Sequence, residues 1–269
     1  MEPISIYKYR EFNQYGWDIV KKHKVFFSSP KSFNDPRDCR VPILAERGTK
    51  KQMYNKTLDF LKERYPQLSR RERKQNAKMQ AEVMYSRRND EARKQEYRKS
   101  IYETTEDVGI FSASEINNNK LLWSHYSGGH TGFCVKLNAD KLVGSVLKYL
   151  LQGCIPIFKS VEYLDNIPSI NPYKMTDEEI FMNIFFTKSL DWAHEREYRI
   201  MVFEKPNTSY TLLPNSIEHI YLGSECSIEN QCEMIKAIKE LPYNVKLSKV
   251  FYDELNYDIY FEQINLQGT

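Results

Sequence analysis

The chain has 269 residues, of which 41% are hydrophobic and 28% charged, a composition that fits globular structure and excludes a disordered or fibrous protein. No stretch approaches the roughly 18 uninterrupted apolar residues of a membrane helix, and the opening MEPISIYKYREF lacks the basic start and apolar run of a signal peptide. The net charge of +3 is unevenly spread: residues 62–99 hold 13 Lys or Arg and six Asp or Glu, a local charge of +7. We therefore expect a cytoplasmic protein without membrane contact and with one basic segment.

The first part of the chain predicts strands and a shaped loop. Residues 5–10 alternate as a strand, and a short helix is expected through Trp17 and Val20. A second strand over residues 24–29 ends at Pro30. Residues 33–36, Phe-Asn-Asp-Pro, then favour a turn, because Asn and Asp bond to nearby backbone and Pro fixes φ.

Residues 52–102 predict a helical hairpin with a wide basic face. Pro66 interrupts the first helix, and Ser69 with Glu72 forms a capping box that opens a second, longer one. The apolar positions are sparse, so the hairpin is expected to be an insertion on a core.

The remaining chain mixes strands and helices without a strict βαβ rhythm. Strands are expected over residues 108–114, 132–137, 157–163, 195–203, 218–222 and 246–252, and helices over 119–126, 176–188 and 227–241. The pattern predicts one α+β domain over residues 1–269, with a mixed, mostly antiparallel or split sheet and the helical hairpin inserted at 52–102.

Glu195, Glu197 and Arg199 are the first candidates for chemistry. Two-residue spacing on a strand would place them on one face, where the paired carboxylates can act as acid and base, ligate a metal or stabilise a cationic transition state. The alternative is a structural ladder of ion pairs.

The segment Trp-Ser-His-Tyr at residues 123–126 concentrates further reactive groups near a helix end. His125 or His130 could act as a general base or bind phosphate, and Tyr126, with Trp123 nearby, could stack on a base or nicotinamide. The alternative is a structural role in the turn, as for most isolated histidines.

Two further sets of side chains allow a functional and a structural interpretation. Asn34, Asp35 and Asp38 could coordinate a cation, although a simple turn is favoured. The basic hairpin could lie along a phosphate backbone, or its charges could form a solvated face. The candidate nucleic-acid-binding residues are Arg70, Arg71, Arg73, Lys74, Arg87 and Arg88.

The five cysteines are odd in number and lack paired CxxC spacing, so neither a disulfide framework nor a four-ligand zinc site is expected. We expect reduced, mostly buried thiols. They are Cys39, Cys134, Cys154, Cys226 and Cys232.

Five ordered motifs resemble those of a large bacterial family known as a domain of unknown function. They run from Tyr7 to Arg199 and read IYKYR, FFSSP with SFNDPRDC, GIFSAS, LLWSHYSGGHTGFCV, and TKS with WAHEREYR.

The chain also resembles, more remotely, ADP-ribosyltransferases, which have a split-sheet α+β fold and a late E-x-E motif. That resemblance implies an NAD cofactor bound by Tyr9 or Arg10. It places Ser28 and Ser29 in the nicotinamide pocket and makes Glu197, with Glu195, the catalytic carboxylates.

The leading hypothesis is therefore an NAD-consuming, ADP-ribosyltransferase-like enzyme that acts as an intracellular toxin or antiphage effector. Its acceptor would be RNA, DNA or protein, and an antitoxin could restrain it. The alternative is a nucleic-acid-binding module or a metal-dependent nuclease built on Asp35, Asp38, His125 and Glu195. A third hypothesis is a protein-interaction domain.

Overall fold

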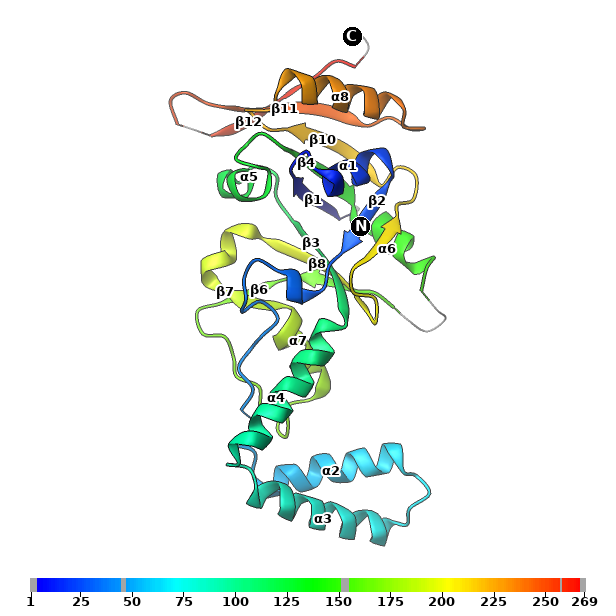
Figure 1. Cartoon of the computed structure of the whole chain (residues 1–269), viewed down its shortest axis with the longest axis vertical. Coiled ribbons are helices and arrows are strands. Elements are labelled where there is room, and N and C mark those ends of the chain that lie inside the picture. Colours follow the sequence, from blue (N-terminus) through cyan, green and yellow to red (C-terminus); the bar gives the residue numbers. More distant parts are fainter. Residues whose placement is uncertain (1–3, 45–46, 151–154, 257, 267–269) are drawn as a thin grey trace. The chain divides into compact units, whose positions relative to one another are not determined.

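The computed structural model describes residues 4–44, 47–150, 155–256 and 258–266. The chain groups into two compact units. The sheet unit comprises residues 1–32, 107–163 and 190–269, and the helical unit comprises residues 33–106 and 164–189. Figure 1 labels the elements of both units.

The sheet unit is built on an eight-stranded sheet with the order β12-β11-β10-β4-β1-β3-β8-β5. All neighbours pair antiparallel except β10 and β11, which are parallel. This architecture confirms the predicted α+β class with a mostly antiparallel sheet. The strands are β1 (Ser5–Arg10), β3 (Val108–Ser114), β4 (Phe133–Asn138), β5 (Ile157–Ser160), β8 (Glu197–Phe203), β10 (Ile217–Leu222), β11 (Lys246–Tyr252) and β12 (Ile259–Gln263).

Strands β1 and β3 pair over a shorter stretch than either strand pairs with its other neighbour. Strands β1 and β4 are in register over six residue pairs, and β3 and β8 over seven. Within the described strands, β1 and β3 share one pair, Tyr7 with Ser114. Beyond that pair the sheet opens, and the ammonium group of Lys8 donates a hydrogen bond to the carbonyl oxygen of Ser112.

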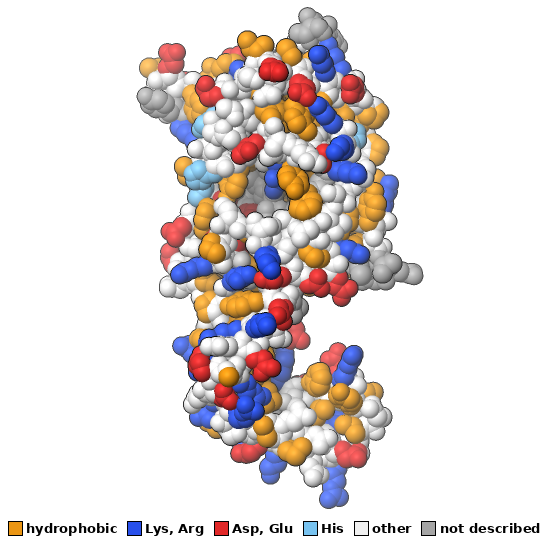
Figure 2. Space-filling model, viewed as in Figure 1, with side chains coloured by type: hydrophobic (Ala, Val, Ile, Leu, Met, Phe, Trp, Pro, Cys, Tyr) orange, Lys and Arg blue, Asp and Glu red, His pale blue; other side chains and the backbone are white. Residues whose placement is uncertain are grey.

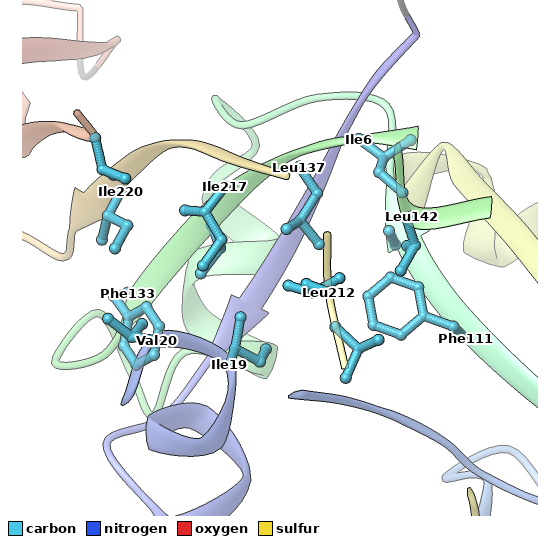
Figure 3. Close-up of a cluster of buried hydrophobic side chains, with 14 of the residues drawn as sticks. Ile6, Ile19, Val20, Phe111, Phe133, Leu137, Leu142, Leu212, Ile217 and Ile220 are labelled. Atoms are coloured by element: carbon cyan, nitrogen blue, oxygen red, sulfur yellow. The ribbon is translucent and has the colours of Figure 1, made fainter. Parts of the chain in front are cut away.

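One face of the sheet carries the main hydrophobic core. Alternation along the strands points Ile6, Phe111 and Phe133 to this face. Figure 3 shows these side chains meeting those of Ile19 and Leu142, which come from helices. The helices that contribute to this core are α1 (Gln14–Lys21), α6 (Ala139–Leu147) and α8 (Ile228–Lys239), and the small sheet of β2 (Lys24–Phe27) and β9 (Thr208–Thr211) joins them.

The opposite face carries a smaller aromatic cluster under α5 (Lys120–Tyr126). Tyr9, Cys134 and Tyr221 point to it from three strands, and Leu122 and Trp123 cover it from α5. Asn119 caps α5, because its side-chain oxygen accepts hydrogen bonds from the backbone of Leu121 and Leu122.

The helical unit contains α2 (Lys50–Arg64), α3 (Arg70–Ser86), α4 (Glu91–Glu106) and α7 (Asp177–Phe185), together with β7 (Thr187–Ser189). The predicted capping box of Ser69 and Glu72 is present at the start of α3. The chain turns between Arg87 and Asp90, so residues 50–106 form three helices where two were expected. Asp90 stabilises that break, since it accepts hydrogen bonds from the side chain of Arg87 and the backbone of Arg93.

Most predicted elements lie within a few residues of their observed bounds, with one important exception. The strand expected over residues 195–203 begins only at Glu197, because residues 190–195 form the 3-10 helix η3 (Leu190–Glu195). Three segments with no predicted element form α6, β9 and β12, and β7 begins inside the helix that was expected over residues 176–188. The remaining short elements are η1 (Pro30–Ser32) and β6 (Glu162–Leu164).

The cysteines follow the expectation where they can be seen. Cys39, Cys134 and Cys226 are buried free thiols, and Cys232 is an exposed one. Cys154 lies outside the described residues. None of the helices in the described ranges combines the length and apolar character that crossing a bilayer requires.

Candidate functional site

Glu197 and Arg199 form a buried ion pair on β8. Arg199 donates from Nε to one oxygen of Glu197 at 2.7 Å and from Nη2 to the other at 3.0 Å. The Arg199 side chain is fully buried and that of Glu197 is 7% exposed. These two residues therefore share a strand face as predicted, and their contact resembles the structural ion pair that was the alternative interpretation.

Glu195 has a different environment, on η3. Its carboxylate accepts a hydrogen bond of 2.5 Å from the hydroxyl of Tyr126, which ends α5. Its backbone carbonyl accepts another from the hydroxyl of Ser114 on β3, at 2.6 Å. Two elements far apart in the sequence therefore hold this buried acid in place.

The turn at Arg196 explains why Glu195 does not continue the strand. Arg196 has a φ of 42°, in the left-handed region that non-glycine residues rarely occupy. This conformation ends η3 and starts β8, so the prediction that all three residues of the E-x-E-x-R pattern share one strand face is wrong for Glu195.

Lys8 and Arg10 bring positive charge to the opening between β1 and β3. The pKa of Lys8 is well below its ordinary value because burial disfavours the charged form and Arg10 repels it. Glu197 and Glu195 act in the opposite direction, which places all these side chains within electrostatic reach of one another. Burial lowers the pKa of Arg10 to about 10, and its Nε has no hydrogen-bond partner among the described residues.

Figure 2 shows a hollow in the surface drawn over the sheet unit, with a Lys or Arg side chain inside it. A surface recess that holds a cationic side chain is the geometry expected of a site for an anionic ligand.

A group of histidines and aromatic residues lies beside Glu195. The rings of His125 and His194 are 6.4 Å apart, and those of Trp192 and His194 are 6.1 Å apart. His125 is exposed. His194 contacts the Asp191 carbonyl through Nδ1 at 3.0 Å, while its buried Nε2 has no partner among the described residues.

The other predicted cofactor-binding residues occupy structural positions. Tyr9 donates to the Ile116 carbonyl at 3.0 Å and packs edge-on against Trp123, whose indole donates to the Asn117 carbonyl at 2.8 Å. The backbone of Ser28 pairs with Ile110 on β3, and the backbone amide of Ser29 donates to the side chain of Asn207. Their role in NAD binding stays a prediction.

The acidic residues of the FNDPRDC loop belong to the helical unit. Asp35 accepts a hydrogen bond from the backbone of Arg37 at 2.8 Å, the geometry of the favoured turn. Asp38 forms a buried ion pair with Lys188 at 3.4 Å. Across the described ranges, no three His, Cys, Asp or Glu side chains are grouped as metal ligands would be.

The predicted nucleic-acid-binding residues divide into two groups along the helical unit. Arg70, Arg71 and Lys74 are exposed on α3, and Arg73 reaches the Pro66 carbonyl at 3.4 Å. Arg87 and Arg88 follow α3 and line a cavity, which is described below.

Sequence reasoning missed Lys8, Ser114 and His194. The alternation of β1 marked Lys8 as a residue on the opposite face from Tyr9, but nothing local indicated that the sheet opens beside it. His194 belongs to the WAHEREYR motif, in which only the glutamates were predicted as site residues.

Comparison with known proteins agrees with the first resemblance over part of the chain. Residues 122–200 match the model of a family described as a protein of unknown function, DUF2971. This range includes α5, Tyr126, Glu195 and the ion pair of β8, and it confirms the expected resemblance to a family of unknown function. The chain matches no curated protein and no solved structure.

Proposed function

We propose that the chain is an ADP-ribosyltransferase-like enzyme that consumes NAD inside the cell and modifies a macromolecule, as a toxin or antiphage effector does. The observation that carries the proposal is the position of Glu195. This buried carboxylate is held by Tyr126 and lies within electrostatic reach of Lys8, beside the opening in a split sheet.

The chemistry of NAD cleavage suits these groups. When the bond between the ribose C1 and the nicotinamide nitrogen breaks, its electron pair goes to nicotinamide and positive charge develops on the ribose. A fixed carboxylate stabilises that charge. The acceptor then forms the new bond at C1 and gives up its proton to a base, a role that exposed His125 can fill.

The N–H donors of β1 suit the other end of the substrate. The pyrophosphate of NAD carries negative charge, and the guanidinium of Arg10 and the terminal nitrogen of Lys8 can donate hydrogen bonds to its oxygens. The buried Nε of Arg10 has no partner among the described residues, which leaves a donor for such an oxygen.

The position of Glu195 changes the choice of catalytic carboxylate. Both oxygens of Glu197 accept hydrogen bonds from Arg199, so we assign the direct role to Glu195 and a positioning role on β8 to Glu197.

The test is incubation of the protein with NAD and a cell lysate, with detection of released nicotinamide and of ADP-ribose on protein, RNA and DNA. Glu195→Gln should lower the rate well over tenfold because it keeps the shape and removes the charge. Glu204→Gln, at an exposed carboxylate, is the matched control. Full turnover by Glu195→Gln would refute the assignment. Activity that is abolished by EDTA, without nicotinamide release, would favour the metal-dependent nuclease.

A nucleic-acid-binding role of the helical unit is the second candidate. It is supported by the exposed cations Arg70, Arg71 and Lys74, which lie together at the start of α3. Such a surface would hold an RNA or DNA acceptor through its phosphates.

A further inference from the structure

The helical unit contains a cavity of about 390 Å³ that the proposed enzyme site does not use. Its wall is formed by α2, the end of α3, the turn that follows and α4, together with Tyr173. The volume falls within the range of about 300–1,000 Å³ that small-molecule sites occupy.

Four cations line this cavity: Arg87, Arg88, Arg93 and Lys94. Glu96 is the one acidic residue among its lining residues, so the wall carries a net positive charge. Figure 2 shows Lys and Arg side chains interspersed with Asp and Glu around α4. Asp90 and Glu91 partly neutralise Arg87 and Lys94. Within the part of the chain that the structure describes, no acidic side chain forms an ion pair with the guanidinium of Arg88 or Arg93.

Arg88 is held in a defined position, and Arg93 lies near Tyr173. The guanidinium of Arg88 stacks on the ring of Tyr85 at 3.9 Å, and its Nη1 donates to the Tyr85 carbonyl at 2.8 Å. Arg93 lies close enough to Tyr173 to oppose the effect of burial on that hydroxyl. Two arginines that line one cavity form a site suited to a phosphate group, because each presents several N–H donors in one plane.

The rest of the wall suits a flat ring. Tyr97 and Tyr173 contribute aromatic surface, and Met53 and Met84 contribute thioether side chains that adapt to an aromatic ligand. Burial raises the pKa of Tyr97 to about 12 and also raises that of Tyr173, so both hydroxyls remain neutral donors near pH 7.

We infer that this cavity binds a mononucleotide, with the phosphates on Arg88 and Arg93 and the base against Tyr97 and Tyr173. Tight binding requires a ligand that contains both a phosphate and an aromatic ring, because the wall offers separate groups for each. The inference is independent of the NAD site, which lies in the other unit.

The test is isothermal titration calorimetry of the full chain with ATP, adenosine and inorganic tripolyphosphate. ATP should bind at least tenfold more tightly than either of its two parts. Arg93→Gln should weaken ATP binding at least tenfold, and Tyr173→Leu should remove the advantage of ATP over tripolyphosphate. The matched control is Arg64→Gln, an exposed arginine at the end of α2 that does not line the cavity.

Each alternative outcome overturns the inference. Equal affinity for ATP and tripolyphosphate would mean attraction by charge alone. Equal losses in Arg64→Gln and Arg93→Gln, together with tight binding of an oligonucleotide, would mean a nucleic-acid surface. Loss of ATP binding in Glu195→Gln, with binding intact in Arg93→Gln, would place the nucleotide in the enzyme site. Circular dichroism of each variant excludes unfolding as the cause.

Discussion

Arg199 lies two residues after Glu197 on β8, and its guanidinium binds both carboxylate oxygens of Glu197. Both side chains are buried. Such a pair stabilises the fold little more than two apolar side chains of similar size would, because burying two charges costs free energy. Removing one partner alone is worse, since it leaves the other charge buried without compensation.

The first prediction follows from this ion pair. Arg199→Met should lower the free energy of unfolding by about 3–5 kcal/mol, because it removes the guanidinium that binds both oxygens of the buried Glu197 carboxylate. The double variant Glu197→Leu with Arg199→Met should recover at least half of that loss. Urea denaturation measures both. Equal losses in the single and double variants would show that Glu197 does not depend on Arg199.

Tyr126→Phe tests how Glu195 is held. This variant removes one hydrogen bond to the carboxylate and leaves the ring in place. We expect the rate of nicotinamide release to fall about tenfold, the value of one charge-assisted hydrogen bond of about 1.5 kcal/mol. The exposed Tyr15, changed to Phe, is the control. If both variants kept the full rate, the hydroxyl of Tyr126 would have no part in positioning Glu195.

Lys8→Met should affect substrate binding more than the chemical step. The methionine keeps an apolar stem near Phe111 but cannot bind a phosphate oxygen. We expect the affinity for NAD to fall at least tenfold and Lys24→Met, at an exposed position on β2, to leave it unchanged. Calorimetry with NAD measures this directly. Unaltered affinity in Lys8→Met would limit Lys8 to a structural role.

The fourth prediction concerns acid stability and His219. Its pKa falls to about 4 because burial and the nearby Lys246 and Lys136 disfavour the charged form. The ring stacks on Tyr221 with centroids 4.1 Å apart, and Nε2 contacts the hydroxyl of Ser248 at 2.9 Å.

In the unfolded chain His219 has a pKa near 6.5 and is protonated as the pH falls, whereas in the folded chain it stays neutral. The free energy of unfolding should therefore decrease as the pH falls from about 7 towards 4. After discounting for partial exposure, we expect His219 to contribute a loss of about 1 kcal/mol between pH 7 and pH 5. His219→Phe keeps the stacking and should flatten this dependence. Urea denaturation at the two pH values measures it, and an equal slope in both proteins would contradict the prediction.

Binding of RNA or DNA to the exposed face of α3 should depend steeply on salt. Each phosphate contact that is lost should reduce the slope of log K against log salt by about 0.7–0.9. Replacing Arg70, Arg71 and Lys74 by Gln should therefore flatten the slope by about two units. Fluorescence anisotropy with a labelled oligonucleotide measures it. If the affinity of the parent protein for the oligonucleotide does not change with salt concentration, α3 does not bind nucleic acid through its phosphates.

Local signals predicted the elements well where periodicity and caps were strong. The alternation of residues 108–114 and the capping boxes at Ser69 and Thr176 correspond to observed boundaries. The position of Glu195 could not be predicted in this way, because it depends on the left-handed turn at Arg196, and Arg carries no local preference for that conformation.

The candidate site was predictable only in part for a related reason. Glu195, Tyr126 and Arg10 were identifiable from residue type and motif, but their proximity depends on pairings between segments that are more than 60 residues apart in sequence. The opening between β1 and β3 is a property of the sheet as a whole, and no single strand sequence encodes it.

The hydrogen bond from Lys8 to the Ser112 carbonyl gives residue 8 a second structural role, besides its place in β1. Where strands normally join through backbone amides, a side chain here supplies the missing donor. A replacement must therefore both fit the strand and supply a donor to this carbonyl oxygen. An arginine would lengthen the bridge, and an apolar residue would leave the Ser112 oxygen without this donor.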